Sequence, residues 1–281
     1  MKLAVASGKG GTGKTTVSVS LAITMAQRKR VAFLDCDVEE PNGHLMLNPV
    51  LQHKEMVAVL VPEIDEQKCD SCGYCAEICA FHALAVLPGN TLVFPEMCHA
   101  CGGCWNFCPK QAITPVDNYI GVVEEGRAEK VRFVHGRLNV GVAMSPPLIR
   151  AVKAKAKNDE LTIIDVPPGT SCPAVKSVEG VDFCILVTEP TPFGLHDLDL
   201  AVQVLHQLKI PCGVVINRSD GLDLTVEEYC GRCKIPVLQK IPLDREVAEG
   251  YAAGIPAVLV KKEWGELFSE LMDKVEEVVS S

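Results

Sequence analysis

The sequence has few aromatic residues, no excess of positive charge and no long apolar run. Aromatic side chains make up 5% of the 281 residues, and the formal net charge at pH 7 is −9. An acidic chain is disfavoured as a nonspecific binder of nucleic acid or of anionic lipid, so we expect neither as a partner. No uninterrupted apolar stretch approaches the roughly 20 residues that a membrane-spanning helix needs.

A signal-peptide pattern is also missing, because only residues 3–6 are apolar before a glycine-rich segment begins. Cysteine, in contrast, is abundant, with 14 residues. In a protein that is not exported the thiols stay reduced, which favours metal ligation over disulfides. We therefore expect a cytoplasmic protein whose cysteines bind metal.

Eight of the cysteines form two copies of the spacing C-x2-C-x2-C-x3-C, and the second copy begins 29 positions after the first. The second copy ends in Cys108-Pro109, as bacterial ferredoxin runs do, and in those runs the fourth cysteine ligates the other cluster. The pattern predicts two [4Fe–4S] clusters with exchanged fourth ligands. Cluster 1 is expected at Cys69, Cys72, Cys75 and Cys108, and cluster 2 at Cys79, Cys98, Cys101 and Cys104.

Two other interpretations of these cysteines stay open. Pairs of the form C-x2-C also make tetrahedral zinc sites, although the third and fourth cysteines here are not spaced as in zinc knuckles. Disulfides are disfavoured by the expected compartment. Ala80 stands where the first copy would usually carry proline, and since proline is not a ligand, this affects backbone shape rather than cluster binding.

A phosphate-binding motif opens the chain. Residues 8–15 fit G-x4-G-K-[ST] and lie between an expected strand at 2–6 and an expected helix at 15–27. The glycines let backbone N–H groups converge on phosphate oxygens, and the helix N-terminus favours negative charge. Lys14 is expected to reach the β- and γ-phosphates of ATP, and Thr15 to ligate Mg²⁺. The alternative is a glycine-rich turn that merely begins a helix.

The nucleotide-binding residues of the loop itself are Gly8, Lys9, Gly10, Gly11, Thr12, Gly13, Lys14, Thr15 and Thr16. With its second lysine at Lys9, this segment resembles the deviant Walker A motif of MinD/ParA-type ATPases, a group that includes Mrp-type iron–sulfur carriers and the nitrogenase iron protein. The resemblance implies that Lys9 reaches the partner's phosphates across an ATP-dependent dimer. A solvated loop lysine is the alternative.

The same resemblance extends to two acidic strand ends. An expected strand at 31–34 is followed by Asp37, which resembles the carboxylate that orients the attacking water. An expected strand at 161–164 is followed by Asp165, a Walker B carboxylate, and by Gly169, a glycine that senses the γ-phosphate. The resemblance thus implies catalytic roles for Lys9, Lys14, Asp37 and Asp165, and a Mg²⁺ site formed by Thr15, Asp37 and Asp165. Asp165 could alternatively cap the next helix.

Further strands are expected at 183–187 and 213–216. Asn217 and Arg218 follow the second of these and resemble the adenine-reading segment of the family, while Pro242 resembles the loop beside the base. The resemblance covers residues 1 to about 60 and about 130 to 281. It implies an α/β fold, a doubly wound and mostly parallel sheet, with ligands at the carboxyl ends of the strands. We expect an ATPase domain at 1–61 and 117–281, interrupted by a small α+β ferredoxin-like insert at 62–116.

The remaining cysteines are harder to interpret. Cys172 lies seven residues beyond Asp165, and Cys230 and Cys233 form a C-x-x-C pair, so all three are candidates for a labile or redox site. Each is otherwise a small buried residue or a helix end. Cys36, Cys184 and Cys212 are expected in the core. The helical period of the C-terminal residues, with an acidic polar face, predicts a packed terminal helix rather than a membrane anchor.

Together these features predict an ATP-hydrolysing protein with Mg²⁺ and two [4Fe–4S] clusters, in which nucleotide-dependent dimerisation controls electron transfer. The dimer would be formed with a second copy or with a related ATPase, and the client would be an unidentified redox or iron–sulfur protein. Two alternatives stay open: a cluster carrier or scaffold of the Mrp type, and a MinD-like positioning ATPase in which the clusters are structural.

Overall fold

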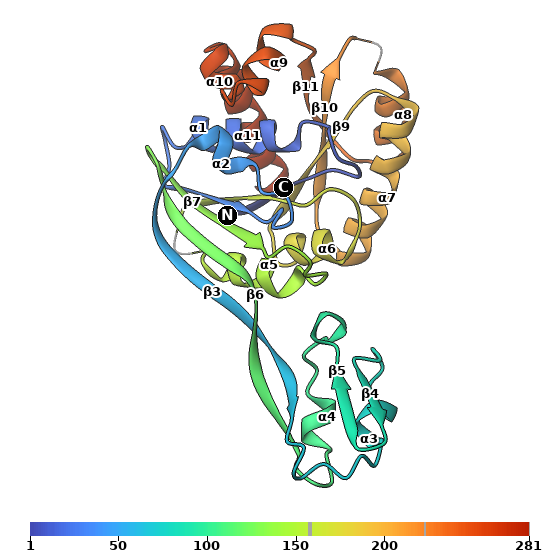
Figure 1. The fold of residues 1–281 in the computed structure, drawn as a ribbon. Helices are drawn as coiled ribbons and strands as arrows, with labels where there is room; N and C mark the ends of the chain where they lie inside the picture. The colour runs from blue at the N-terminus through green and yellow to red at the C-terminus, as the bar shows by residue number, and fades with distance from the viewer. Residues whose placement is uncertain (157–158, 222, 281) are drawn as a thin grey trace.

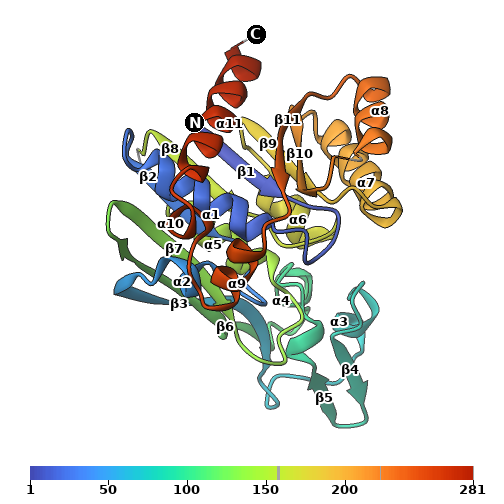
Figure 2. The same cartoon turned by 90° about the horizontal axis from the view of Figure 1, so that it is seen from above.

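The computed structural model describes residues 1–156, 159–221 and 223–280. Its main body is a sheet of nine strands covered by helices on both faces (Figures 1 and 2). The strands follow one another across the sheet in the order β11 (Val237–Pro242), β10 (Cys212–Ser219), β9 (Phe183–Thr188), β1 (Lys2–Ala6), β8 (Leu161–Asp165), β2 (Val31–Asp35), β7 (Val131–Leu138), β6 (Ile113–Ala128) and β3 (Val50–Ile64).

The seven strands from β11 to β7 are mutually parallel, while β6 and β3 run antiparallel to their neighbours. The expectation of a mostly parallel α/β sheet is therefore confirmed. The sequence-based strands at 2–6, 31–34, 161–164, 183–187 and 213–216 all form, within a few residues of the expected ends. They are short runs buried on both faces, as strands inside a helix-covered parallel sheet must be.

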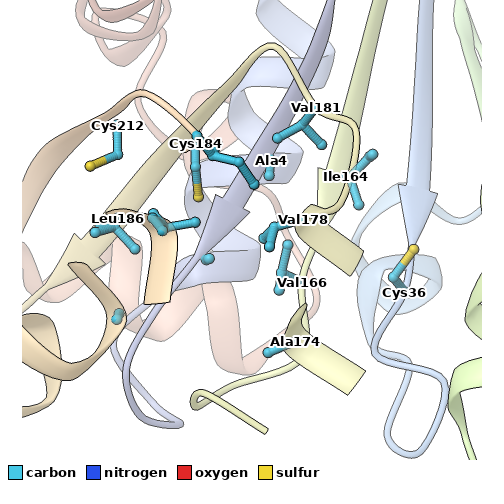
Figure 3. Packing of buried hydrophobic residues seen from close by; sticks show 14 of the residues in the cluster. Ala4, Cys36, Ile164, Val166, Ala174, Val178, Val181, Cys184, Leu186 and Cys212 are labelled. Carbon is cyan, nitrogen blue, oxygen red and sulfur yellow. The ribbon is translucent and has the colours of Figure 1, made fainter. Parts of the chain in front are cut away.

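Two apolar layers hold the helices to the sheet. On one face lie α1 (Lys14–Met25), α2 (Gly43–Leu47), α9 (Arg245–Ala252), α10 (Ala257–Val260) and α11 (Trp264–Ser280), which pack on side chains such as Leu3, Phe33 and Phe183. On the other face lie α5 (Pro146–Ala154), α6 (Cys172–Val178), α7 (Pro192–Leu208) and α8 (Leu224–Cys233). Figure 3 shows part of this second layer, in which Ala4, Ile164 and Leu186 of the strands lie in one apolar cluster with Ala174 and Val178 of α6.

A long strand pair carries the cysteine segment away from the main body. β3 and β6 pair from Val50–Arg127 near the body to Ile64–Ile113 at the far end, where residues 65–112 form a small module (Figure 1). The module contains α3 (Tyr74–Glu77), β4 (Leu84–Leu87), β5 (Asn90–Val93), the 3₁₀ turn η1 (Pro95–Met97) and α4 (Gly103–Asn106). The expected insert, 62–116, thus includes the last rungs of the strand pair as well as the module.

The C-terminal helix α11 is packed into the body, as the sequence indicated. Trp264, Phe268, Leu271, Met272 and Val275 are all buried in the layer that contains α1. Among the described residues, none of the helices combines the length and the apolar character that crossing a bilayer requires.

Candidate functional site

The glycine-rich loop connects the end of β1 to the beginning of α1, at the carboxyl edge of the parallel strands. Gly13 has a φ of +88° and precedes the helix, and its carbonyl accepts the first helical hydrogen bond, from Val17 (3.0 Å). Gly8 lies against the backbone of α7, because a Cβ at this position would stand 2.0 Å from the Asp197 carbonyl oxygen. The loop therefore depends on glycine both for its left-handed turn and for a close helix contact.

Three of the sequence-predicted side chains meet directly behind this loop. The Thr15 hydroxyl donates a hydrogen bond of 2.7 Å to Oδ2 of Asp165, and Lys14 Nζ lies 3.3 Å from Oδ1 of the same carboxylate. Asp37 lies at the rim, with its Oδ2 4.0 Å from Lys14 Nζ. A hydroxyl and two carboxylates converging beside a phosphate loop form an oxygen-rich donor set of the kind Mg²⁺ binds. The residues present therefore fit the metal.

The electrostatics of this cluster follow from its burial. Burial alone would lower the pKa of Lys14, but Asp165, Asp37 and Asp35 together hold that pKa above its usual value. Burial raises the pKa of Asp37 to about 6, although the Lys14 ammonium opposes the shift. Lys14 thus remains charged, and an additional cation in this site would favour ionised carboxylates.

Asp35 is a member of the cluster for which the sequence predicted no role. It is fully buried, and its two oxygens accept hydrogen bonds from the N–H groups of Gly43 (2.9 Å) and Asp37 (3.1 Å). Burial, followed by the charge of Asp165, raises the pKa of Asp35 to about 8. Asp35 therefore ties α2 and Asp37 to the end of β2. Its position directly before Cys36 and Asp37 was visible in the sequence, but its contact with Gly43 was not.

Gly169 lies at the turn after β8, as expected, with a φ of +88°. Its N–H donates to the Ser7 carbonyl oxygen (2.9 Å), which places the turn against the beginning of the phosphate loop. To contact a γ-phosphate, this N–H would first have to leave the Ser7 acceptor.

A cavity of about 450 Å³ opens in front of the loop. Its lining includes Gly10, Gly11, Gly13, Lys14, Thr15, Thr16 and Asp37 on the phosphate side, and Asn217, Arg218 and Pro242 on the opposite side. The structure thus brings the sequence-predicted base-side residues to the same cavity as the phosphate loop. Asn217 also supports the loop, since its Nδ2 donates to the Thr12 carbonyl oxygen (2.7 Å). Tyr251 and Trp264 line the cavity as well, and the sequence analysis did not identify them.

Lys9 points elsewhere. Its Nζ lies 3.3 Å from Oε2 of Glu189, and the other oxygen of this carboxylate accepts a hydrogen bond from Arg218. Glu189 was missed by the sequence analysis, because nothing in the segment after β9 distinguishes it from an ordinary surface carboxylate.

The cysteine module has an internal two-fold repeat in its backbone. Left-handed φ angles at Ser71, Gly73 and His82 recur 29 positions later at Ala100, Gly102 and Gln111. The helices α3 and α4 begin 29 positions apart, and hydrogen bonds cross between the halves, from Phe94 to Ala83 (2.9 Å) and from Asp65 to Ala112 (2.8 Å). The sequence repeat is therefore also a structural repeat, and the two halves are interlocked.

The eight thiols lie within the same small module, and which of them share a cluster stays a prediction. Cys69, Cys72, Cys75 and Cys108 line one small cavity. Cys79 packs against the apolar cluster that contains Cys98 and, together with Cys75 and Cys108, against the cluster that contains Cys104. In equivalent positions, the N–H groups of Ala83 and Ala112 donate to the Sγ atoms of Cys79 (3.3 Å) and Cys108 (3.4 Å). Hydrogen bonds of this kind surround cluster-bound sulfurs, so the residue types present suit iron–sulfur clusters.

The thiols of neither expected cluster converge on a common centre, however. Within the described ranges, no group of three or more His, Cys, Asp or Glu side chains has the geometry of a metal site. Burial raises the pKa of Cys75 and Cys98, and raises that of Cys104 to about 11. These three cysteines therefore favour the protonated thiol, and metal binding would have to displace those protons.

The other cysteines fall into two groups. Cys36, Cys184 and Cys212 are buried in the apolar layer, which confirms their expected place in the core (Figure 3). Cys230 is also buried there, and Cys233 is partly buried beside it, whereas Cys172 is exposed at the beginning of α6. Burial raises the pKa of Cys230 to about 11, so metal binding at this thiol would have to displace its proton, as at Cys104.

Comparison with known proteins agrees with the fold. An uncharacterised protein of Methanocaldococcus jannaschii is 31% identical over 99% of this chain and 98% of its own length. An iron–sulfur cluster carrier protein of Pyrococcus horikoshii is 24% identical over 99% of this chain and 87% of that protein.

Among solved structures, the septum site-determining protein MinD from P. horikoshii, complexed with Mg-ADP, superposes with a TM-score of 0.61. It is 21% identical, and the match covers 99% of this chain and 96% of that one. A family model described as the CobQ/CobB/MinD/ParA nucleotide binding domain matches residues 3–257. The chain therefore belongs to the CobQ/CobB/MinD/ParA family of P-loop nucleotide-binding proteins.

Proposed function

We propose that this protein is an ATPase that couples nucleotide-dependent dimerisation to electron transfer through two [4Fe–4S] clusters held by its cysteine module. The observation that carries the proposal is the place where the strand pair β3–β6, which carries the module, joins the main sheet. β7 pairs with β2, which ends at the nucleotide site, and on its other side with β6, which runs to the module. A rearrangement at the end of β2 therefore has a short, continuous route to the module.

The loop after β7, between Leu138 and Ser145, provides a second connection between the nucleotide site and the module. The Leu138 N–H donates to the carbonyl oxygen of Val38 (2.8 Å), next to Asp37, and the Ser145 hydroxyl donates to Glu39 (2.9 Å). The loop between Leu138 and Ser145 is thus attached at both ends to the segment that would respond to the γ-phosphate.

The same loop faces the module. Val140, Val142 and Met144 line a cavity of about 240 Å³ together with Glu96 and Cys98 of the module. Cys98 is a proposed ligand of cluster 2. Movement of the loop would therefore change the solvent access of this ligand, which is one of the factors that set a cluster potential.

The proposed ATP cycle uses the residues of the phosphate site. Lys14 and Thr15 would hold the triphosphate with Mg²⁺, and Asp37 would position the attacking water. Lys9 would neutralise charge on the phosphates of the partner subunit. Gly169 would exchange the Ser7 carbonyl for a γ-phosphate oxygen, so that the turn after β8 responds to hydrolysis.

When bound, [4Fe–4S] clusters supply one-electron transfer, which none of the side chains of the module performs by itself. The chain's own contribution is to hold the sulfurs, through Ala83 and Ala112, and to control access to them.

Hydrogen exchange tests the proposal. Anaerobically prepared protein would be compared without nucleotide, with Mg–ADP and with the nonhydrolysable analogue Mg–AMPPNP. We expect AMPPNP to change protection not only in the phosphate loop but also at residues 138–145 and 95–98. Ser145→Ala should weaken the change at 95–98, whereas Ser280→Ala, which removes a hydroxyl contact on α11, should not. Changes confined to the phosphate loop would contradict the coupling.

A cluster carrier is the second candidate, favoured by the similarity to iron–sulfur cluster carrier proteins and by the exposure of Cys172. A carrier would transfer iron to an apo-ferredoxin and would lose transferable iron on Cys172→Ser or Cys230→Ser. Iron bound only through the module, and not transferred, favours the electron-transfer function.

A further inference from the structure

The interaction between Lys9 and Glu189 raises a question that the proposed cycle leaves unanswered. If Lys9 acts on the phosphates of a partner subunit, it must be available at the surface. In the structure its ammonium group is instead 3.3 Å from a carboxylate of its own chain, and its side chain is only 33% exposed.

Glu189 is held rigidly by the turn that leads from β9 into α7. The Glu189 carbonyl oxygen accepts a hydrogen bond from the Thr191 N–H (2.8 Å), and the Thr191 hydroxyl caps α7 by accepting from Gly194 (3.0 Å). Gly194 is confined as well, since a Cβ there would lie 2.4 Å from the Glu189 carbonyl oxygen. The backbone of Glu189 therefore has little freedom to follow Lys9 if that residue moves.

The Glu189 side chain is only 12% exposed, and its carboxylate contacts two cations. One is Lys9, and the other is Arg218, which lines the nucleotide cavity and has a left-handed φ of +57°. A non-glycine residue in this conformation is uncommon, and its surroundings must hold it there. Glu189 thus connects the loop lysine to the base side of the nucleotide site.

We propose that Glu189 is a positioning residue that retains Lys9 within its own subunit until a nucleotide-loaded partner competes for the ammonium group. This inference rests on the proposed function, because it assumes that Lys9 acts across a dimer. Its consequence is that dimerisation requires a Lys9–Glu189 contact to break in each subunit, which lowers the affinity of the dimer.

The contact itself is tested first, in protein without nucleotide. The acetylation rate of the Lys9 amine by a water-soluble acylating reagent would be measured by mass spectrometry, with the exposed Lys262 as internal reference. Glu189→Gln should raise the rate at Lys9 severalfold and leave Lys262 unchanged. Glu189→Asp, which keeps the charge, should lie closer to the wild type. Arg218→Gln should slow the acetylation of Lys9, because the Glu189 carboxylate then pairs with Lys9 alone. An unchanged Lys9 rate in Glu189→Gln would overturn the proposal.

The role is tested next, by sedimentation velocity in the presence of Mg–AMPPNP. Partly exposed ion pairs contribute a small free energy, so two of them lost in Glu189→Gln should tighten the dimer by about 2- to 10-fold. In a Lys9→Ala background the same substitution should have no effect. The control is Glu160→Gln, which removes a carboxylate paired with Arg30 at the amino ends of the strands, away from the nucleotide site. An equal effect in both backgrounds would show that Glu189 does not act through Lys9.

The two measurements separate the failures. If acetylation responds as expected but no variant dimerises with Mg–AMPPNP, the proposed nucleotide-dependent dimerisation is wrong and the retention of Lys9 has no role in it. If the wild type dimerises but acetylation does not respond, only the inference about Glu189 is wrong.

Discussion

Thr15 and Asp165 lie 150 positions apart in the sequence and share a hydrogen bond of 2.7 Å between Oγ1 and Oδ2. Thr15 lies in the first turn of α1, and Asp165 ends β8, so the bond joins the beginning of this helix to the end of that strand. In this arrangement the Asp165 carboxylate fixes the orientation of the Thr15 hydroxyl, and both residues would help to hold Mg²⁺.

Asp165→Asn should therefore affect the metal-dependent step more than nucleotide binding. We expect the ATP hydrolysis rate with Mg²⁺ to fall on the order of 100-fold, and nucleotide affinity without Mg²⁺ to change much less. Asp182→Asn is a suitable control, because Asp182 accepts a hydrogen bond from the Lys2 N–H at the amino ends of the strands, away from the nucleotide site. Equal losses with and without Mg²⁺ would contradict the assignment of Asp165.

Two glycines of the phosphate loop should respond differently to alanine. A Cβ at Gly8 would meet the Asp197 carbonyl at 2.0 Å, whereas a Cβ at Gly10 has no atom within 4 Å. Gly8→Ala should therefore destabilise the protein by about 1–3 kcal/mol, and Gly10→Ala should change its stability by less than about 1 kcal/mol. Denaturant unfolding of both variants measures the difference, and equal stabilities would show that α7 does not confine the loop.

The proposed exchange of fourth ligands between the two cysteine runs predicts which substitutions remove the same iron. Cys69→Ser and Cys108→Ser should each lose about four of about eight iron atoms, and the double variant should lose no more than either. Cys79→Ser should remove the other four. Cys212→Ser, in the core, should keep all of them. Iron counting after anaerobic reconstitution gives the result, and additive losses for Cys69 and Cys108 would mean that each run holds its own cluster.

The buried pair of His135 and Glu124, with Nε2 and Oε2 3.0 Å apart, predicts a pH effect on stability. Burial lowers the pKa of His135, although its hydrogen bond to Glu124 opposes the shift. Unfolding then takes up a proton below the unfolded pKa of about 6.5, so the free energy of unfolding falls as the pH drops through that range. Burial lowers the pKa of His44 as well, which adds to the same trend.

His135→Asn should flatten this dependence. The Tm difference between pH 7.5 and pH 5.5 should be smaller in the variant than in the wild type. The pKa of Asp35 is raised to about 8, so its titration makes the free energy of unfolding rise as the pH drops. This contribution is the same in both proteins, and the comparison removes it. An identical pH dependence of Tm in the two proteins would show that His135 is not a buried neutral group.

The sequence predicted well what depends on local pattern. The phosphate loop and the strand ends at Asp37 and Asp165 are short motifs next to buried strands, and such strands of a parallel sheet bring their carboxyl ends to one edge. The 29-residue repeat of the cysteines recurs in the backbone as matching left-handed turns at Gly73 and Gly102, while the exchange of cluster ligands stays a prediction.

Pairing between segments that are distant in the sequence was harder to predict. β3 begins with seven exposed residues, so its partner face is not marked by alternation of apolar and polar side chains. Its register with β6 is set across the intervening module, which no local signal reveals. The contact of Lys9 with Glu189 is a further example, since these residues are 180 positions apart and meet only when β1 and β9 pair.

The central claim is that nucleotide state controls the iron–sulfur module, and cluster reduction kinetics test it most directly. Anaerobically reconstituted protein would be mixed with a chemical reductant in a stopped-flow instrument, without nucleotide and with Mg–AMPPNP. The account predicts that the reduction rate changes with Mg–AMPPNP and that Lys14→Ala, which removes the phosphate-binding lysine, abolishes this change. Identical reduction rates with and without the nucleotide, in protein shown to bind it, would contradict the account.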